Sequence, residues 1–219
     1  MVIAMKKATM FEHIPFAYYK ALAPASIRTY YQGEIDWIQE NLGQGEMLLD
    51  VGCGAGHGLA QAVSNYEVVN GIDLSRKALL IADKMFSWTK HVWFFNVDAA
   101  EMPLMWASRY DAVICLGAGF GNMSYEAVLK EMARVVKPDG RVILSVYNEH
   151  ARNAQLEFYK AAGFEVDSEE DNSITLKEGV TSTRFTKKQL EELAESVGME
   201  ATIHPIAKIG YIAEMKHIN

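Results

Sequence analysis

The sequence has few cysteines and no long apolar run, and these shortages exclude several classes of protein. Only two of its 219 residues are cysteine, and no histidine or cysteine cluster has the spacing of a zinc site, so neither a disulfide framework nor a metal is expected. No apolar run reaches the roughly 18 residues that a membrane-spanning helix needs. The first ten residues lack the apolar stretch and cleavage site of a signal peptide. We therefore expect a cytoplasmic protein without a membrane partner.

Positive charge is also scarce. Acidic residues outnumber basic ones 28 to 21, which gives a net charge of −7. A protein that binds nucleic-acid backbones usually presents a basic face, and here no more than two basic residues are adjacent. The balance argues against a nucleic-acid partner, although a local basic patch can be hidden in a negative average.

From residue 47 onward, short apolar runs alternate with helical patterns. The expected strands are 47–51, 67–72, 91–97, 110–116, 141–147, 202–206 and 209–215, with a hairpin from 174–176 and 181–185. The expected helices are 59–64, one capped by Ser75, 124–136, 156–162 and one capped by Thr186. A turn is expected at 137–140. Apolar strands that alternate with helices indicate an α/β, doubly wound, mostly parallel sheet with helices on both faces. Ligands bind such sheets beyond the carboxyl ends of the strands.

Two segments lie outside this alternation. Residues 1–46 are rich in aromatic side chains and are expected to form an N-terminal lid or a set of helices. Residues 47–219 form the main domain, and 148–185 is an insertion in it. A connection of this length exceeds what packing requires, and such insertions are commonly functional.

The strongest local signal is the turn after the first strand, where glycine occupies positions 52, 54, 56 and 58. Glycines at a strand-to-helix turn let the backbone pass close to a ligand. The G-x-G-x-x-G fingerprint of dinucleotide folds fails here, because the positions that require glycine hold His57 and Leu59. Asp50 lies within the apolar strand that precedes the turn, and a charged group there needs a partner.

Two more carboxylates follow expected strands. Asp73 ends the second strand, 21 residues after Gly52, and an acidic residue at about this place accepts hydrogen bonds from ribose hydroxyls. Asp98 ends the third strand, where an adenine amino group is a suitable donor. The alternatives are a helix-capping role for Asp73 and a turn-forming role for Asp98.

Together these motifs resemble the class I S-adenosylmethionine-dependent methyltransferases over roughly residues 48–147. The resemblance implies a seven-stranded sheet with an antiparallel last strand, and S-adenosyl-L-methionine (SAM) as cofactor, converted to S-adenosyl-L-homocysteine (SAH). It further implies that Asp50, Gly52 and Gly54 hold the methionine part, Asp73 the ribose, Leu74 the adenine face, and Asp98 and Ala99 the adenine amino group. Leu116, Tyr19 and Arg28 are further expected cofactor contacts, the last through the cofactor carboxylate.

Methyl transfer from a sulfonium depends mainly on holding the acceptor in line, so no fixed catalytic residue is expected. His13, His57, Glu149 and His150 are candidate proton acceptors, with a surface role as the alternative for each. Residues 115–123 should face the methyl group. They lack a carboxylate for a metal, an Asn/Asp-Pro-Pro-aromatic motif and a Pro-Cys pair, which favours a small-molecule acceptor, methylated at N or O.

Tyr31, Asn122 and Tyr147 are expected, with Tyr19, to line the acceptor pocket. Tyrosine faces attract a sulfonium, but the tyrosines are equally suited to packing helices onto the sheet. Two other functions stay open: a methyltransferase for tRNA, rRNA or protein, and a SAM-binding partner subunit without turnover.

Overall fold

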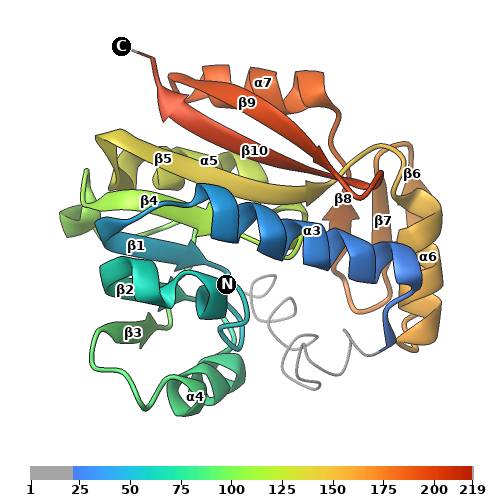
Figure 1. Ribbon diagram of the computed structural model, residues 1–219. Coiled ribbons are helices and arrows are strands. Elements are labelled where there is room, and N and C mark those ends of the chain that lie inside the picture. The colour runs from blue at the N-terminus through green and yellow to red at the C-terminus, as the bar shows by residue number, and fades with distance from the viewer. Residues whose placement is uncertain (1–21, 219) are drawn as a thin grey trace.

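The computed structural model describes residues 22–218, which form a seven-stranded sheet with helices on both faces (Figure 1). The strand order is β3-β2-β1-β4-β5-β10-β9. The strands are β1 (Gly45–Val51), β2 (Tyr66–Ile72), β3 (Val92–Phe95), β4 (Tyr110–Cys115), β5 (Val136–Tyr147), β9 (Met199–Ile206) and β10 (Gly210–His217). Strands β1 to β5 are parallel, and β10 is antiparallel to β5 and β9. The predicted fold class is confirmed.

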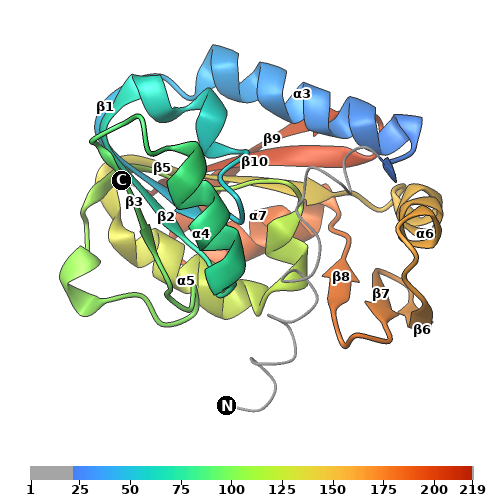
Figure 2. The same cartoon turned by 90° about the horizontal axis from the view of Figure 1, so that it is seen from below.

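Helices cover both faces of the sheet. Figures 1 and 2 show α3 along one face and α5 and α7 along the other. The helices are α3 (Ala25–Asn41), α4 (Arg76–Met85), α5 (Tyr125–Val135), α6 (Arg152–Ala161) and α7 (Lys187–Ser196). Short 3-10 helices are η1 (Leu59–Gln61), η2 (Val63–Asn65), η3 (Leu104–Trp106) and η4 (Gly119–Asn122). The apolar faces of α3, α4, α5 and α7 pack on the sheet, as an amphipathic pattern predicts, whereas α6 packs beside α3.

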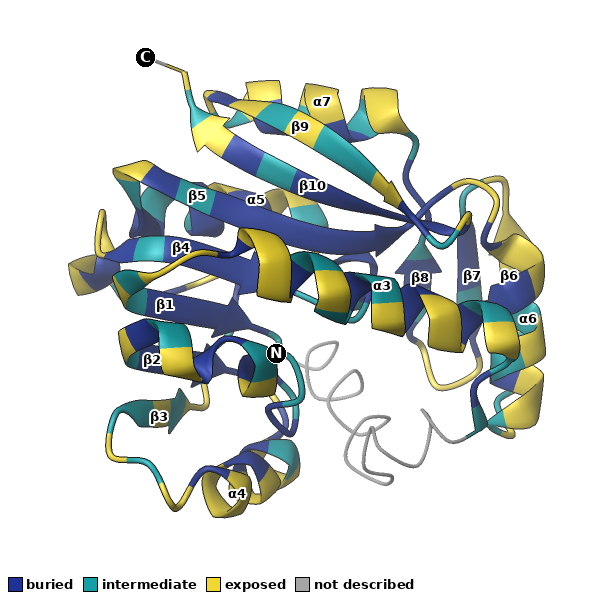
Figure 3. Ribbon diagram, viewed as in Figure 1, coloured by how far each residue is buried: buried dark blue, intermediate teal, exposed yellow. Residues whose placement is uncertain are grey.

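The central strands are buried on both sides (Figure 3). Successive side chains of a strand point to opposite faces. Accordingly, Leu48 joins the apolar cluster under α3 and α4, whereas Leu49 joins the cluster under α5 and α7. This two-sided burial explains why these strands read as continuous apolar runs and not as alternating ones.

Two local predictions are wrong. The helix expected at 59–64 consists of the two 3-10 turns η1 and η2, because a run of six residues after a glycine turn is too short for a stable α-helix. The turn expected at 137–140 lies inside β5, where the partner of β4 advances from Val136 to Arg141 between Tyr110 and Ala112. The extra residues are absorbed as an irregularity in the ladder.

The insertion after β5 is a small unit with its own sheet. It contains α6 and the antiparallel strands β6 (Val166–Glu170), β7 (Ser173–Leu176) and β8 (Thr181–Thr183). Figure 1 shows it beyond the carboxyl end of β5. The expected hairpin is β7 and β8, while β6 lies in an acidic run for which no strand is expected from the sequence.

The insertion begins and ends at one place. Asn148 forms an isolated bridge with Phe185, and the Phe185 N–H donates to the Tyr147 carbonyl at 2.9 Å. Next to this junction the guanidinium of Arg184 is buried and donates to the Gln155 side chain at 2.9 Å and to the Asp171 carbonyl at 3.0 Å. These hydrogen bonds tie α6 and the small sheet together.

Candidate functional site

The glycine turn after β1 lies at the carboxyl end of the sheet. Gly52, Gly54 and Gly56 have φ angles of +70°, +52° and +85°, which glycine adopts without the strain that a side chain brings. A Cβ atom on Gly54 would meet no atom of residues 22–218 within 4 Å, whereas one on Gly52 would collide with the Met123 side chain. A ligand along this turn therefore reaches bare backbone at Gly54 and meets Met123 beside Gly52.

Asp50 precedes the turn and is 2% exposed. Burial raises its pKa, the charges of Glu34 and Asp73 raise it further, and no hydrogen bond from residues 22–218 lowers it. A carboxylate without a donor or a cation in a buried position is unfavourable in its charged form. Asp50 is thus suited to a ligand that brings positive charge or an N–H group.

Asp73 follows β2 and connects two turns. Its Oδ2 accepts from the Gly54 N–H at 2.9 Å and its Oδ1 from the Ser75 N–H at 2.7 Å. Burial raises its pKa, and the backbone donors oppose the rise. The cap of α4 is Ser75, which accepts from the Ala78 N–H at 3.2 Å. Each carboxylate oxygen of Asp73 keeps a second acceptor site for a ligand hydroxyl.

The segment after β3 completes this side of the site. Asn96 donates to the carbonyls of Asp73 and Leu74 at 2.9 and 3.0 Å, which holds the ends of β2 and β3 together. The Oδ1 of Asp98 accepts from the Ala100 N–H at 2.9 Å, so the turn-forming role of Asp98 is present. Leu74 is 40% exposed, so its side chain is accessible to the flat face of a ligand.

The loop after β4 begins with two residues of left-handed backbone conformation and is hydrogen-bonded to a buried glutamate. Gly117 and Ala118 have φ angles of +68° and +57°, and an alanine in this region is strained. The Oε2 of Glu34, from α3, accepts from the Gly117 N–H at 2.7 Å and from the Ser145 hydroxyl. Tyr30 donates to Ser145 Oγ at 3.0 Å. This network fixes the loop that is expected to face the transferred methyl group.

Glu34 and Ser145 are absent from the sequence-based site. A signal for Glu34 exists, because it lies four residues after Tyr30 and seven after Ile27, on the buried stripe of α3. A carboxylate on an apolar stripe is unfavourable unless it has a partner. The same argument applies to Asp50 in its apolar strand. Ser145 is a polar residue inside an otherwise apolar strand and carries the same kind of signal.

The predicted pocket tyrosines are buried. Tyr31 and Tyr147 are 4% and 5% exposed, and both flank Tyr30 with ring centroids 5.4 and 5.1 Å away. Burial raises the pKa of Tyr31 and Tyr147, so both hydroxyls stay protonated at neutral pH. The packing role that the sequence allows is therefore present, and lining a pocket stays a prediction.

The remaining predicted residues are scattered. Asn122 is half-buried, and its buried Oδ1 has no hydrogen-bond partner in the described part of the chain. Arg28 is exposed on α3 and donates to the Ala23 carbonyl. Ala99 is buried and Leu116 is half-buried at the end of β4. Tyr19, like His13, lies outside the described residues.

Of the other candidate proton acceptors, Glu149 accepts from the Tyr211 hydroxyl at 3.3 Å. Glu149 and His150 are exposed, and their side chains lie 4.0 Å apart. His57 is half-buried in the glycine turn itself. The expected surface role fits Glu149 and His150.

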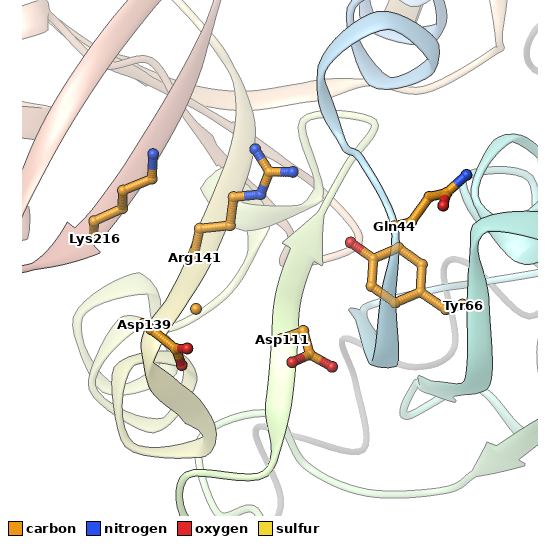
Figure 4. Close-up of a pocket in the computed structure, with 7 residues that line it drawn as sticks. Gln44, Tyr66, Asp111, Asp139, Arg141 and Lys216 are labelled. Atoms are coloured by element: carbon orange, nitrogen blue, oxygen red, sulfur yellow. The ribbon is translucent and has the colours of Figure 1, made fainter.

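A polar pocket lies at the opposite end of the sheet (Figure 4). Its lining consists of Gln44, Tyr66, Asp111, Asp139, Gly140, Arg141 and Lys216. Arg141 pairs with Glu214 at 3.0 Å, Asp111 pairs with Lys137 at 2.6 Å, and Tyr66 donates to the Leu42 carbonyl at 3.2 Å. The ion pairs join β5 to β10 and β4 to β5, while Tyr66 and Arg141 attach the end of α3 to the sheet through the Leu42 carbonyl, so structural contacts account for this pocket.

Two classes of feature are absent from the described part of the chain. Within residues 22–218 no three side chains of His, Cys, Asp or Glu are grouped as a metal ion would need. In the same range, no helix combines the length and the apolar character that crossing a bilayer requires.

The chain is similar to known methyltransferases. Residues 48–140 match a family model described as a methyltransferase domain. The ubiquinone biosynthesis O-methyltransferase of Dechloromonas aromatica is 34% identical over 124 residues, which are 54% of this chain and 52% of that protein. The chain spans about half the length of the curated relatives it matches.

Solved structures share the fold over most of the chain. The DhpI–SAH complex has a TM-score of 0.71 at 13% identity and covers 98% of this chain and 97% of its own. The 1,6-didemethyltoxoflavin-N1-methyltransferase of Burkholderia thailandensis, with 1,6-didemethyltoxoflavin and SAH bound, has a TM-score of 0.62 at 18% identity, covering 89% and 79%. At these identities the likeness shows a common fold.

Proposed function

We propose that the chain, whose residues 48–140 match a methyltransferase-domain model, is a class I SAM-dependent methyltransferase that transfers the methyl group of SAM to nitrogen or oxygen of a small molecule. The observation that carries the proposal is the arrangement of Asp50, Asp73 and Asp98 at the ends of β1, β2 and β3, around a glycine turn in which no atom of residues 22–218 lies within 4 Å of the Cβ position of Gly54. SAM presents an ammonium, a sulfonium, two ribose hydroxyls and an adenine amino group. Each of these is a cation or a donor that a carboxylate accepts.

The proposed cofactor contacts follow this order along the sheet. Asp50 with the backbone of Gly52 and Gly54 would hold the methionine part. Asp73 would hold the ribose hydroxyls with Leu74 against the adenine, and Asp98 with Ala99 would accept from the adenine amino group. Leu116 at the end of β4, Arg28 on α3 and Tyr19 complete the proposed set. The buried carboxylate of Asp50, which accepts no hydrogen bond from residues 22–218, is the part of the site that most needs a cationic ligand.

When bound, SAM supplies a methyl carbon that its sulfonium already activates. The residues of this chain then have to bind, orient and exclude water, since in-line placement of the acceptor supplies much of the rate. A base is needed only for an acceptor that is protonated at the reacting atom. We assign no residue to that role.

The acceptor is proposed to bind at η4, the end of β5 and the insertion, because the cofactor takes up the ends of β1 to β3. Tyr31, Asn122 and Tyr147 are proposed to line that space, and Asn122 has a buried oxygen still to be satisfied. Of residues 1–46, α3 packs on the sheet, and the part before α3 is proposed to act as a lid on the domain 47–219. A negative net charge and a relative named for ubiquinone biosynthesis support a small-molecule acceptor over a nucleic acid.

The cytoplasm is the proposed location. Cys53 and Cys115 are both unpaired and buried, as is usual for proteins of a reducing compartment.

The direct test is incubation with methyl-labelled SAM and an extract of small metabolites. The expected result is a labelled metabolite together with SAH, and mass spectrometry identifies the acceptor. If the label is found in RNA or protein, the acceptor is a macromolecule and the proposed small-molecule acceptor is wrong. Tight SAM binding without SAH formation in any extract would indicate a partner subunit without turnover. If calorimetry finds NAD binding and no SAM binding, the proposed function is wrong.

A further inference from the structure

Glu34 brings a second buried carboxylate to the proposed cofactor site from outside the glycine motifs. It is 6% exposed on the sheet-facing side of α3. The Gly117 N–H at 2.7 Å and the Ser145 hydroxyl hold its Oε2 at the carboxyl end of β4. A tertiary network thus fixes the position of this charge, and solvent does not screen it as it would a surface charge.

Asp50 lies on the neighbouring strand and supplies the independent observation. It is paired with Ile114 in the parallel ladder of β1 and β4. Ile114 lies three residues before Gly117. The Asp50 side chain is 2% exposed and accepts no hydrogen bond within residues 22–218. A Cβ atom on Gly58 would lie 3.4 Å from Asp50 Oδ2 and 3.2 Å from Leu116. The orphaned carboxylate therefore faces the glycine turn, between the two strand ends.

We propose that Glu34, together with Asp50, makes this site selective for the sulfonium cation of SAM over the neutral thioether of SAH. The inference rests on the proposed function and names a specificity-determining residue for it. In the transfer, the bond from sulfur to the methyl carbon breaks and its electron pair stays on sulfur, while the acceptor donates a pair to the methyl carbon. The cofactor thereby loses one positive charge. Two fixed carboxylates favour the reactant over the product.

The charges around Asp50 make the preference dependent on protons. The titratable groups that face it are Glu34 from α3, Asp73 after β2, Cys53 in the glycine turn and Cys115 at the end of β4. Burial raises the pKa of both thiols, which are therefore neutral near pH 7. Among residues 22–218 the charges that act on Asp50 are thus negative, and a cation that enters the site lowers the pKa of Asp50. SAM should release more protons on binding than SAH does.

The test compares three ligands on matched variants. Titration calorimetry measures the affinity of SAM, SAH and sinefungin, an analogue that carries an amine in place of the sulfonium. Glu34→Gln keeps an oxygen acceptor for Gly117 and removes the charge. The control is Glu40→Gln, which removes the same charge from the exposed side of the same helix. We expect Glu34→Gln to weaken SAM and sinefungin about tenfold and SAH less than about twofold, with no change in the control.

Two other outcomes overturn the inference while leaving the proposed function intact. An equal loss for all three ligands would mean that Glu34 only supports the loop. A loss for SAM without a loss for sinefungin would mean that the methyl group, and not the charge, is recognised. A wild-type protein that binds neither SAM nor SAH instead overturns the proposed function.

A measurement on the wild type keeps the inference testable if Glu34→Gln does not fold. Calorimetry in two buffers with different ionisation enthalpies counts the protons that binding releases. More protons released with SAM than with SAH, across pH 5 to 8, supports the charge preference. Equal proton release for the two ligands overturns it.

Discussion

Replacing Asp73 tests whether its side chain binds the ribose of SAM. Asp73→Ala removes a charged acceptor for the ribose hydroxyls, and we expect SAM affinity to fall about 10- to 100-fold, from a loss of roughly 1.5–3 kcal/mol. The fold should survive, although the Gly54 and Ser75 N–H groups lose their acceptor. Calorimetry with SAM measures the change.

The matched control is Asp83→Ala, which removes a carboxylate from the exposed side of α4. Its SAM affinity should equal that of the wild type. Wild-type SAM binding by Asp73→Ala would show that the ribose lies elsewhere.

The raised pKa of Asp50 predicts that the free energy of unfolding depends on pH. Its pKa is raised in the folded protein, so its contribution to the free energy of unfolding is fully present below the unfolded value of about 3.9 and is lost as pH rises through the folded pKa. Asp50→Asn removes this loss. The variant should therefore be more stable than the wild type near neutral pH and bind SAM more weakly.

Urea denaturation at a series of pH values measures both curves. Because the charge of Asp73 also raises the pKa of Asp50, the difference between the two curves reports Asp50 together with its coupling to Asp73. An Asn variant that is less stable than the wild type at pH 7 would show that the Asp50 charge is compensated.

Whether a site residue can be predicted from the sequence depends on how far apart along the chain it and its partners lie. Asp50 and Asp73 can be found because each interrupts or ends an apolar strand within a short motif. Glu34 and Ser145 are 111 residues apart and meet only because α3 packs on β5. No local pattern reports that contact, so only the folded structure brings them together.

At the scale of elements, the long periodic segments could be predicted and the short connections could not. The helix after Ser75 and the one after Thr186 follow from their caps, and Thr186 with Gln189 forms a full capping box. The 137–140 segment, Lys-Pro-Asp-Gly, has the residues of a turn, yet pairing with β4 continues around it. Tertiary pairing thus overrode local preference.

The start of α3 predicts where a truncation is tolerated. Ala23, Ile27 and Tyr30 are at most 1% exposed, so deleting residues 1–21 keeps every described core side chain. If the N-terminal segment is a lid, this deletion should abolish methyl transfer and weaken SAM binding only modestly. Labelled turnover and calorimetry are the two measurements.

Deleting residues 1–30 is the comparison, since it removes Ile27 and Tyr30 and should lower the free energy of unfolding by several kcal/mol. Circular dichroism melts distinguish the two truncations. Normal methylation by the 22–219 chain would refute the lid.

At the scale of the whole molecule, ligands that bind only the folded state should raise its melting temperature. SAM or SAH at 100 times its Kd adds about 2.7 kcal/mol to the free energy of unfolding. NAD should add nothing, because the dinucleotide fingerprint fails. RNA should add nothing at physiological salt, because the net charge is −7.

Differential scanning fluorimetry with the four ligands checks this prediction. A shift with RNA that shrinks steeply as salt is raised would reveal a basic patch that the average charge conceals. It would also redirect the search for the acceptor toward nucleic acid.

The junction between Tyr147 and Phe185 has a consequence for how such a protein diversifies. The chain leaves the sheet and returns to it at adjacent residues, and the segment between them has an apolar cluster of its own, around Tyr159, Ile174, Leu176 and Val180. A segment of this kind behaves as a cassette. It can be lengthened, shortened or exchanged by recombination at two neighbouring points, because the entropy of closing the loop grows only slowly with its length. The face toward the acceptor can then change in evolution while the strands that carry Asp50 and Asp73 are inherited intact.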